Sequence, residues 1–414
     1  MNSKSFLLAG FLFLGIISFY SSALAEEDSL FYCSTPDSIG RTVQAGQQTL
    51  SPVAIFACGT DASTDRLPSW YSSIFNFAVQ LSVPRFYRDN SLGKYIMNST
   101  AFGLNDTLCF SFSYPANGLM QDHDGVGQWF QEVITQADDS IDFASFDADS
   151  DGVVDGLFFM IVNHTSDDGF APLQSDFNYT TNDPAAGGGY VEIVTERVVV
   201  VKPSGHERAI ALAAHEWGHV LGLPELYGRA WNDFNRLGYW DLGSFSIMGT
   251  GFPGLRAVPF DPYSRIRLGW DTAIVVNSPL YDVEITDYLT TGAIYKLPKS
   301  STEYFLVTNH KGVDPENDSV GKWEERMPGI LGGLLVWHID ENALFDFGMQ
   351  LFNKRVDCEL AQGLFTYPLG YESTTVVANA VSGRDSLDFL KKKPGFPRPW
   401  DTTWIGFKPP NIAS

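Results

Sequence analysis

The apolar positions of this chain follow two periods, one typical of strands and one typical of helices. Residues 53–56 and 157–162 form short, continuously apolar runs, and residues 108–112 form a mostly apolar one; all three predict strands. Residues 190–201 alternate in part and then become continuously apolar, which also predicts a strand. Residues 126–137 instead show the spacing of an amphipathic helix. Strands and helices are therefore expected to alternate through the first half of the chain.

The second half of the chain has a different pattern. Residues 229–270 are rich in glycine, proline and aromatic side chains, which predicts a loop-rich segment. From about residue 276 short strands dominate, among them 303–309 and 334–339. Residues 376–414 carry a run of lysines and several prolines and predict an irregular tail. The pattern as a whole predicts an α+β protein in which residues 276–375 form a β-rich extension.

The N-terminus has the pattern of a targeting segment. Lys4 precedes an apolar stretch at residues 6–20, and Ala23 and Ala25 form a small-residue cleavage site. Residues 1–25 are therefore predicted to be a signal peptide. No later stretch approaches eighteen consecutive apolar residues, so no stable association with a membrane is expected after cleavage. The predicted location is secreted and extracellular.

Composition limits the classes of function. The chain has 414 residues, of which 44% are hydrophobic and 14% aromatic, enough for a sizeable core in two or three packed domains or in one large two-lobed enzyme. Its 49 acidic residues outnumber the 27 basic ones, giving a net charge of −22. This charge disfavours nucleic acids and anionic membranes as partners. A monomer is expected.

Cysteines and glycosylation sequons fit a secreted protein. The four cysteines lack the spacing of a zinc or redox motif and allow two disulfides in three connectivities. They are Cys33, Cys58, Cys109 and Cys358. Five N-x-[S/T] sequons would carry glycans in a source that glycosylates secreted proteins. They are Asn98, Asn105, Asn163, Asn178 and Asn317.

A second helix is predicted between residues 204 and 221. Ser204 and Glu207 form a possible capping box at its start. An apolar interior follows without a helix breaker, and Gly222 and Pro224 end the pattern. The helix carries the sequence His-Glu-Trp-Gly-His at residues 215–219 in its last turns.

The spacing within this helix indicates metal-assisted hydrolysis. His215 and His219 are four residues apart, so both imidazoles can reach one metal ion. Glu216 follows the first histidine directly, as in the H-E-x-x-H motif of zinc peptidases, where it acts as the general base. Zinc lowers the pKa of a bound water from 15.7 to about 7 and so supplies a nucleophile at neutral pH.

A catalytic zinc site needs a third protein ligand. About twenty residues after the second histidine, where some zinc peptidases have a glutamate, this chain has Asp241 and no glutamate. In the extended pattern H-E-x-x-H-x-x-G-x-x-H a glycine turn delivers the third ligand. Gly222 stands at the glycine position and Glu225 where the last histidine would fall. Glu225 is the preferred third ligand, with Asp241 or water as the alternative. Met248, in the turn-forming run 246–251, predicts the methionine turn that lies beneath such sites.

These residues resemble the secreted metallopeptidases of the immune inhibitor A type. The resemblance rests on residues 215–227, 238–251 and 268–270, with weaker likeness at 82–95 and 333–340, and spans roughly residues 48 to 365. It implies a zincin-type catalytic domain over residues 26–275, with an upper lobe to about 222 and a lower lobe after it. It also implies a zinc endopeptidase with the ligands and base named above. The family usually has aspartate at position 225, and Met-Ser where this chain has Met248-Gly249.

A second candidate metal site precedes the apolar run at 157–162. Acidic residues occupy positions 1, 3, 5 and 9 of a loop with Gly152 at position 6, as in the opening of an EF-hand calcium loop. The glutamate expected at position 12 is missing. The alternative is a solvated acidic turn, but the resemblance also implies a structural ion here. The predicted calcium ligands are Asp147, Asp149, Asp151, the carbonyl of Val153, and Asp155.

The sequence therefore predicts a secreted zinc endopeptidase that acts on protein or peptide substrates. Glu216 takes the proton of the attacking water and passes it to the leaving amine. Tyr227 and Tyr239 are candidates for stabilising the oxyanion. Two alternatives belong to other classes: a catalytically silent binding protein that retains the zincin fold, and a calcium-stabilised surface protein whose histidines are incidental. No cofactor other than zinc and calcium is expected.

Overall fold

A computed structural model describes most of the chain between residues 48 and 359. The described residues are 48–62, 69–103, 109–116, 123–162, 168–171, 173, 178–226, 242, 246–249, 257–310, 333–342 and 355–359. The predicted signal peptide at 1–25 and the predicted tail at 376–414 lie outside them, as do Cys33, Tyr227, Tyr239, Asp241 and the sequons at 105, 163 and 317. Helices and strands are mixed, as an α+β protein requires.

The first sheet holds the strands predicted in the first half of the chain. Its order is β4 (Thr100–Phe102), β2 (Val53–Cys58), β6 (Leu157–Ile161), β10 (Val198–Lys202) and β7 (Asp168–Phe170), with β5 (Phe110–Ser111) also paired to β2. Every pairing is parallel except that between β10 and β7, which is antiparallel. The antiparallel strand β7 therefore forms one edge of this sheet.

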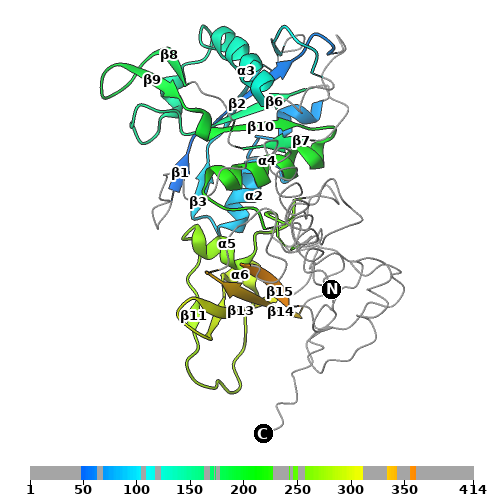
Figure 1. Cartoon of the computed structure of the whole chain (residues 1–414), viewed down its shortest axis with the longest axis vertical. Coiled ribbons are helices and arrows are strands. Elements are labelled where there is room, and N and C mark those ends of the chain that lie inside the picture. Colours follow the sequence, from blue (N-terminus) through cyan, green and yellow to red (C-terminus); the bar gives the residue numbers. More distant parts are fainter. Residues whose placement is uncertain are drawn as a thin grey trace, which may run out of the picture. The chain divides into compact units, whose positions relative to one another are not determined.

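The central strands are buried on both faces, which explains their continuously apolar sequences. Along β6, Leu157, Phe159 and Ile161 pack into one hydrophobic cluster while Phe158 and Met160 pack into another. The first cluster contains α3 (His123–Ala137). The second contains α4 (His206–Val220) and α2 (Val83–Asn90). Figure 1 shows α3 and α4 on opposite faces of the sheet.

The prediction of one strand over residues 190–201 is wrong. The chain forms β9 (Tyr190–Ile193), a 3-10 turn at Thr195–Arg197, and then β10. β9 pairs with β8 (Tyr179–Pro184) as an antiparallel hairpin outside the first sheet. β9 buries Val191 and Ile193, and β10 buries four consecutive valines, so the apolar pattern runs through the break without marking it.

The predicted helix at 204–221 is confirmed as α4, but its predicted capping box is not. Gly205, with an extended backbone, is the N-cap residue in place of Ser204, and as a glycine it supplies no capping side chain. Because the helix starts one residue later than a Ser204 cap requires, Glu207 stands at the second helical position instead of the third. The predicted helix at 126–137 starts earlier, at His123.

Short elements complete the described part of the chain outside the two large sheets and the hairpin. They are β1 (Gln48–Leu50), which pairs in parallel with β3 (Tyr95–Met97), the 3-10 turns Ser69–Ser73 and Phe143–Phe146, α5 (Pro262–Arg267) and α6 (Tyr288–Thr291). The helix α5 lies within the segment that the sequence predicts to be loop-rich.

The predicted β-rich extension contains a second sheet. Its order is β11 (Ile274–Val275), β12 (Tyr295–Pro298), β13 (Glu303–His310), β14 (Gly333–Asp340) and β15 (Val356–Glu359). All neighbours are antiparallel except β11 and β12. Its buried hydrophobic residues, among them Leu306 and Trp337, belong to the same hydrophobic cluster as α4. This sheet therefore shares a core with the helix that carries the histidines.

One disulfide joins Cys58 at the end of β2 to Cys109. Of the three connectivities, this leaves only the one in which Cys33 would pair with Cys358. Asn98 and Asn178, the two sequon asparagines in the described part of the chain, are exposed. Among the described helices, none is both long enough and apolar enough to cross a membrane.

Candidate metal centre

The position of Trp217 fixes the rotation of α4 about its axis. Its ring packs against Phe158 of β6, with ring centroids 4.9 Å apart, and its Nε1 donates a hydrogen bond of 2.8 Å to the hydroxyl of Tyr95. A Cβ added to Gly156 would lie 2.2 Å from this ring, so the close contact requires glycine there. Residues two positions apart on a helix lie about 200° apart around its axis, so His215 and His219 both face away from this contact.

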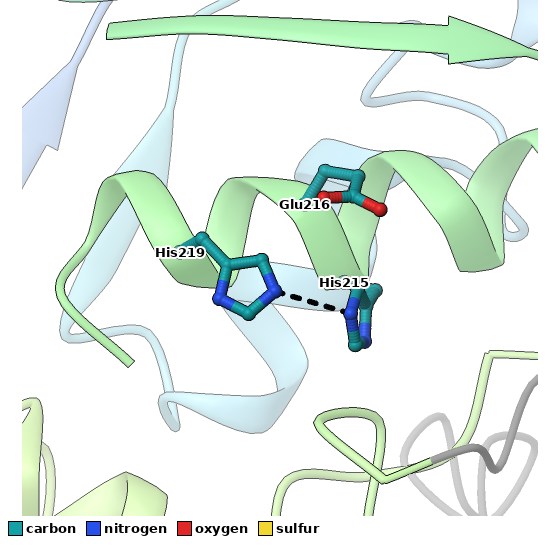
Figure 2. A group of neighbouring side chains, drawn as sticks. All are labelled: His215, Glu216 and His219. Atoms are coloured by element: carbon teal, nitrogen blue, oxygen red, sulfur yellow. Dashed lines mark hydrogen bonds between the residues drawn. The ribbon is translucent and has the colours of Figure 1, made fainter. Parts of the chain in front are cut away.

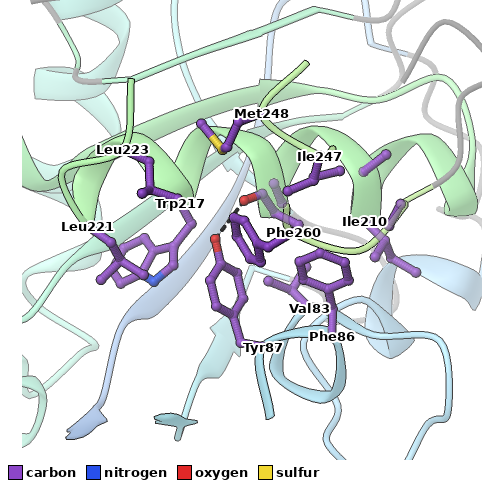
Figure 3. Close-up of a cluster of buried hydrophobic side chains, with 14 of the residues drawn as sticks. Val83, Phe86, Tyr87, Ile210, Trp217, Leu221, Leu223, Ile247, Met248 and Phe260 are labelled. Carbon is purple, nitrogen blue, oxygen red and sulfur yellow. Dashed lines mark hydrogen bonds between the residues drawn. The ribbon is translucent and has the colours of Figure 1, made fainter. Parts of the chain in front are cut away.

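Aromatic residues of α2 and of the segment before α5 support the same helix. The hydroxyl of Tyr87 donates a 2.6 Å hydrogen bond to the carbonyl of Ala214. Phe86 and Tyr87 both pack against Phe260. Figure 3 shows these side chains gathered along α4 together with Met248. The last turns of α4 are thus held by non-local contacts directly beside the two histidines.

The two imidazoles are turned towards each other. Their Nε2 atoms lie 3.2 Å apart, and both side chains are buried (Figure 2). His215 Nδ1 lies 2.7 Å from the carbonyl oxygen of Ile247, and His219 Nδ1 lies 2.8 Å from that of Leu223. Carbonyl oxygens only accept, so each Nδ1 must carry the proton that it donates. In the neutral rings both Nε2 atoms therefore present lone pairs to the same point.

Glu225 completes this arrangement. One of its carboxylate oxygens lies 3.2 Å from Nε2 of His215 and the other 3.2 Å from Nε2 of His219. The chain reaches this position through Gly222, whose φ of +89° favours glycine. The amide of Leu226 then donates a 2.8 Å hydrogen bond to the carbonyl of Met248, which fixes the backbone next to Glu225.

These three side chains fit a tetrahedral zinc ion. Two ligand atoms that each lie about 2.0–2.1 Å from such an ion are about 3.3–3.4 Å apart. The separations of 3.2 Å between the imidazole nitrogens and from each nitrogen to the carboxylate are close to this value. Two lone pairs and a carboxylate at this spacing repel one another unless a positive charge lies between them. Zinc sites commonly pair each ligating imidazole with a hydrogen-bond acceptor on its other nitrogen, as both rings do here.

The electrostatics of the metal-free group show how strongly it favours a cation. Burial alone would lower the pKa of His215, but the carboxylates of Glu225 and Glu216 together outweigh burial and raise this pKa. Burial alone would raise the pKa of Glu225, but the imidazoles of His219 and His215 lower it well below its ordinary value. The carboxylate of Glu225 therefore stays ionised and stabilises positive charge next to the two imidazoles.

Glu216 lies beside the group. It is buried, and its carboxylate forms a set with the ligand atoms of His215 and His219 whose members all lie within 4.8 Å of one another. On its other side is Gly169 of the edge strand β7. A Cβ added there would lie 3.2 Å from both Cγ and Oε1 of Glu216. A carboxylate at this position can exchange protons with a water or a substrate held by the same metal ion.

The segment 246–249 connects the predicted ligands. The carbonyl of Ile247 holds His215, and the carbonyl of Met248 holds the backbone after Glu225. The side chain of Met248 is fully buried and lies against α4 at Gly218, where an added Cβ would stand 2.6 Å from the sulfur. Met248 therefore packs against the helix at the residue next to His219, and its role as a methionine turn stays a prediction.

The acidic loop before β6 brings three of its predicted ligands together. The carboxylates of Asp147, Asp149 and Asp151 lie within 4.8 Å of one another. Asp147 accepts hydrogen bonds from the amides of Asp151 (3.0 Å) and Gly152 (2.9 Å), and Gly152 has a φ of +84°. Glycine at the sixth position is thus required for the sharp turn of this loop.

Two other predicted calcium ligands are placed differently. Asp155 is fully buried and accepts a 2.7 Å hydrogen bond from the amide of Ser51, and it is not part of the three-carboxylate group. The carbonyl of Val153 lies 3.4 Å from the guanidinium of Arg197, which also pairs with Asp151 at 3.0 Å. The structure therefore brings together only the first half of the predicted loop.

Two features near the histidines were not predicted from the sequence. Gly169 belongs to a three-residue strand, too short for a periodic pattern. Ser246 and Asp261, which are hydrogen-bonded to each other behind the segment 246–249, are fifteen residues apart and show no local signal. Tyr227 and Tyr239, the candidates for stabilising the oxyanion, and Asp241, the alternative third ligand, lie outside the described residues.

Comparison with known proteins adds no relative: no family model and no curated protein matches this chain.

Proposed function

We propose that this protein is a secreted zinc-dependent endopeptidase. The observation that carries the proposal is the convergence of His215, His219 and Glu225, whose ligand atoms are spaced by 3.2 Å with both imidazole Nδ1 atoms engaged elsewhere. Three protein ligands with a fourth position left for water or substrate define catalytic zinc sites. The likeness of several sequence segments to immune inhibitor A-type metallopeptidases, with a two-lobed zincin-type domain, supports the same assignment.

The proposed mechanism assigns each side chain one task. His215, His219 and Glu225 would hold a zinc ion, which when bound would supply Lewis-acid polarisation of the peptide carbonyl and a lowered pKa for the attacking water. Glu216 accepts the proton of that water and then delivers it to the leaving amine. His215 and His219 remain oriented by the carbonyls of Ile247 and Leu223, which keep their Nε2 atoms unprotonated.

The substrate backbone is proposed to lie along β7. This strand is the edge of the first sheet, and its Gly169 touches Glu216. Extended peptides bind to exposed sheet edges through main-chain hydrogen bonds. A peptide paired with this edge would run past the carboxylate that handles the proton.

Secretion and a structural calcium ion belong to the same proposal. The disulfide between Cys58 and Cys109 supports an oxidising compartment. The three clustered carboxylates and the left-handed Gly152 support a calcium ion bound by Asp147, Asp149 and Asp151. Such an ion would stabilise the turn that leads into β6.

Metal removal and replacement tests the proposal. The purified protein should contain one zinc ion per chain and should cleave casein. Dialysis against a chelator should abolish cleavage, and stoichiometric zinc should restore it. A protein that binds no zinc, or that cleaves casein equally well after the metal has been removed, would overturn the assignment.

A further inference from the structure

A buried carboxylate lies behind the segment that holds the metal ligands. Asp261 is 1% exposed and caps α5 by accepting hydrogen bonds from the amide (2.9 Å) and the hydroxyl (2.7 Å) of Ser264. Its Oδ2 also accepts a 2.6 Å hydrogen bond from the hydroxyl of Ser246. Capping of α5 requires only the first two bonds, so the third joins Asp261 to a different part of the chain.

Ser246 also forms hydrogen bonds with the backbone of the turn 246–249. Its hydroxyl oxygen accepts a 3.1 Å hydrogen bond from the amide of Met248, and its carbonyl accepts one from the amide of Gly249. Both the side chain and the carbonyl of Ser246 therefore hold this turn closed. The carbonyls of Ile247 and Met248 then point outward, to His215 Nδ1 at 2.7 Å and to the amide of Leu226 at 2.8 Å. Two consecutive carbonyls thus contact one predicted ligand, His215, and the backbone next to another, Glu225.

We propose that Ser246 and Asp261 are positioning residues of the metal site. Their hydrogen bond holds the turn 246–249 in the one conformation in which its carbonyls orient His215 and the backbone next to Glu225. This inference rests on the proposed zinc site and deepens it. It assigns the affinity for the ion in part to a hydrogen bond between two side chains that do not touch the ion.

Substitution of two serines separates positioning from capping. Ser246→Ala removes the bond to the turn and leaves the cap of α5 in place. Ser264→Ala, its matched control, removes a hydroxyl that donates to the same carboxylate oxygen but leaves the turn attached. The zinc dissociation constant of each is measured by competition with a chelating dye. Loss of an outer hydrogen bond at a zinc site weakens binding by about 10–100-fold. Ser246→Ala should weaken it about tenfold, and Ser264→Ala by less than about twofold.

A second readout does not depend on the metal. The chain has seven histidines, so selective ¹⁵N labelling of histidine gives a tractable spectrum. In the metal-free wild type and in Ser264→Ala, the Nδ1 proton of His215 should exchange slowly because it donates to Ile247. In Ser246→Ala it should exchange faster. Equal exchange in the two variants, or equal zinc affinity, would overturn the positioning role. A wild type that binds no zinc while the exchange difference persists would overturn the zinc site and leave the positioning of His215 intact.

Discussion

Met248 packs against α4 at a point where only glycine leaves room for it. A Cβ at position 218 would lie 2.6 Å from the sulfur and 3.2 Å from the terminal methyl of Met248. Because Met248 is fully buried, its side chain has no solvent into which it can move. The glycine of the His-Glu-Trp-Gly-His sequence is therefore explained by the methionine that lies beneath it.

The substitution Gly218→Ala tests this contact. Helix propensity alone predicts a gain of about 1 kcal/mol when alanine replaces glycine in a helix interior. Overpacking of a filled core instead costs about 1–3 kcal/mol. We expect a net loss in the free energy of unfolding, measured by denaturant titration. Met248→Ala should relieve the clash, so the double variant should be more stable than the sum of the single effects predicts. Strict additivity would contradict the contact.

Gly169→Ala should lower turnover without removing the metal. The added Cβ would stand 3.2 Å from Cγ and Oε1 of Glu216, so the carboxylate must shift by a few tenths of an ångström. Small displacements of a catalytic group are costly, and we expect about a tenfold loss in kcat with unchanged zinc affinity. Gly187→Ala is the control, because a Cβ there meets no atom within 4 Å. Equal kcat values for the two variants would argue against Glu216 as the base.

Glu225→Gln tests the third ligand. The amide keeps the size of the side chain but removes the negative charge that lies 3.2 Å from both imidazoles. Because a direct ligand is lost, the zinc dissociation constant should rise by more than the roughly 100-fold upper range for an outer hydrogen bond. Glu225→Asp, which restores the residue usual in the resembling family, should retain zinc more tightly than the glutamine variant. Unchanged affinity in Glu225→Gln would instead favour Asp241 or water as the third ligand.

The buried carboxyl of Asp261 should make stability depend on pH. Burial raises the pKa of Asp261 above its unfolded value of 3.8, although hydrogen bonds from Ser246 and Ser264 oppose this effect. Between the unfolded and folded pKa values the folded state keeps a proton that the unfolded state has released. The free energy of unfolding contributed by this group therefore falls as pH rises through that window, and it levels off above the folded pKa.

Asp261→Asn provides the measurement, because asparagine does not titrate. With a chelator present to exclude metal, the stability of the wild type relative to the variant should decline as pH rises from about 4. Denaturant titrations at a series of pH values give this difference directly. A difference that grows with pH would mean that the folded state lowers the pKa of Asp261.

The local part of the site could be predicted from the sequence, and the non-local part could not. His215, Glu216 and His219 lie on one helix, where spacing alone determines which side chains are neighbours. Glu225 follows through a single glycine turn. The edge strand β7 and the bond between Ser246 and Asp261 depend on pairing across the fold, for which the residues themselves carry no periodic signal.

For the fold too, local features could be predicted from the sequence and non-local pairing could not. Strands β2 and β6 are buried on both faces and were predicted from their unbroken apolar runs. Residues 190–201 have an equally apolar sequence but divide between a hairpin and the first sheet. Burial determines the apolar pattern of both parts, whereas the partner of each strand is decided by contacts distant in sequence. In the acidic loop before β6, Gly152 likewise stands at the turn where the pattern predicts glycine, while Asp155 bonds to Ser51 instead of joining the other carboxylates.

The most direct test of the central claim compares the wild type with Glu216→Ala for both zinc content and casein cleavage. Glu207→Ala, in the first turn of the same helix, is the control for changes to α4. The account predicts one zinc ion per chain in all three proteins, with cleavage lost only in Glu216→Ala. Cleavage by Glu216→Ala at the wild-type rate, or a wild type that contains no zinc, would contradict it.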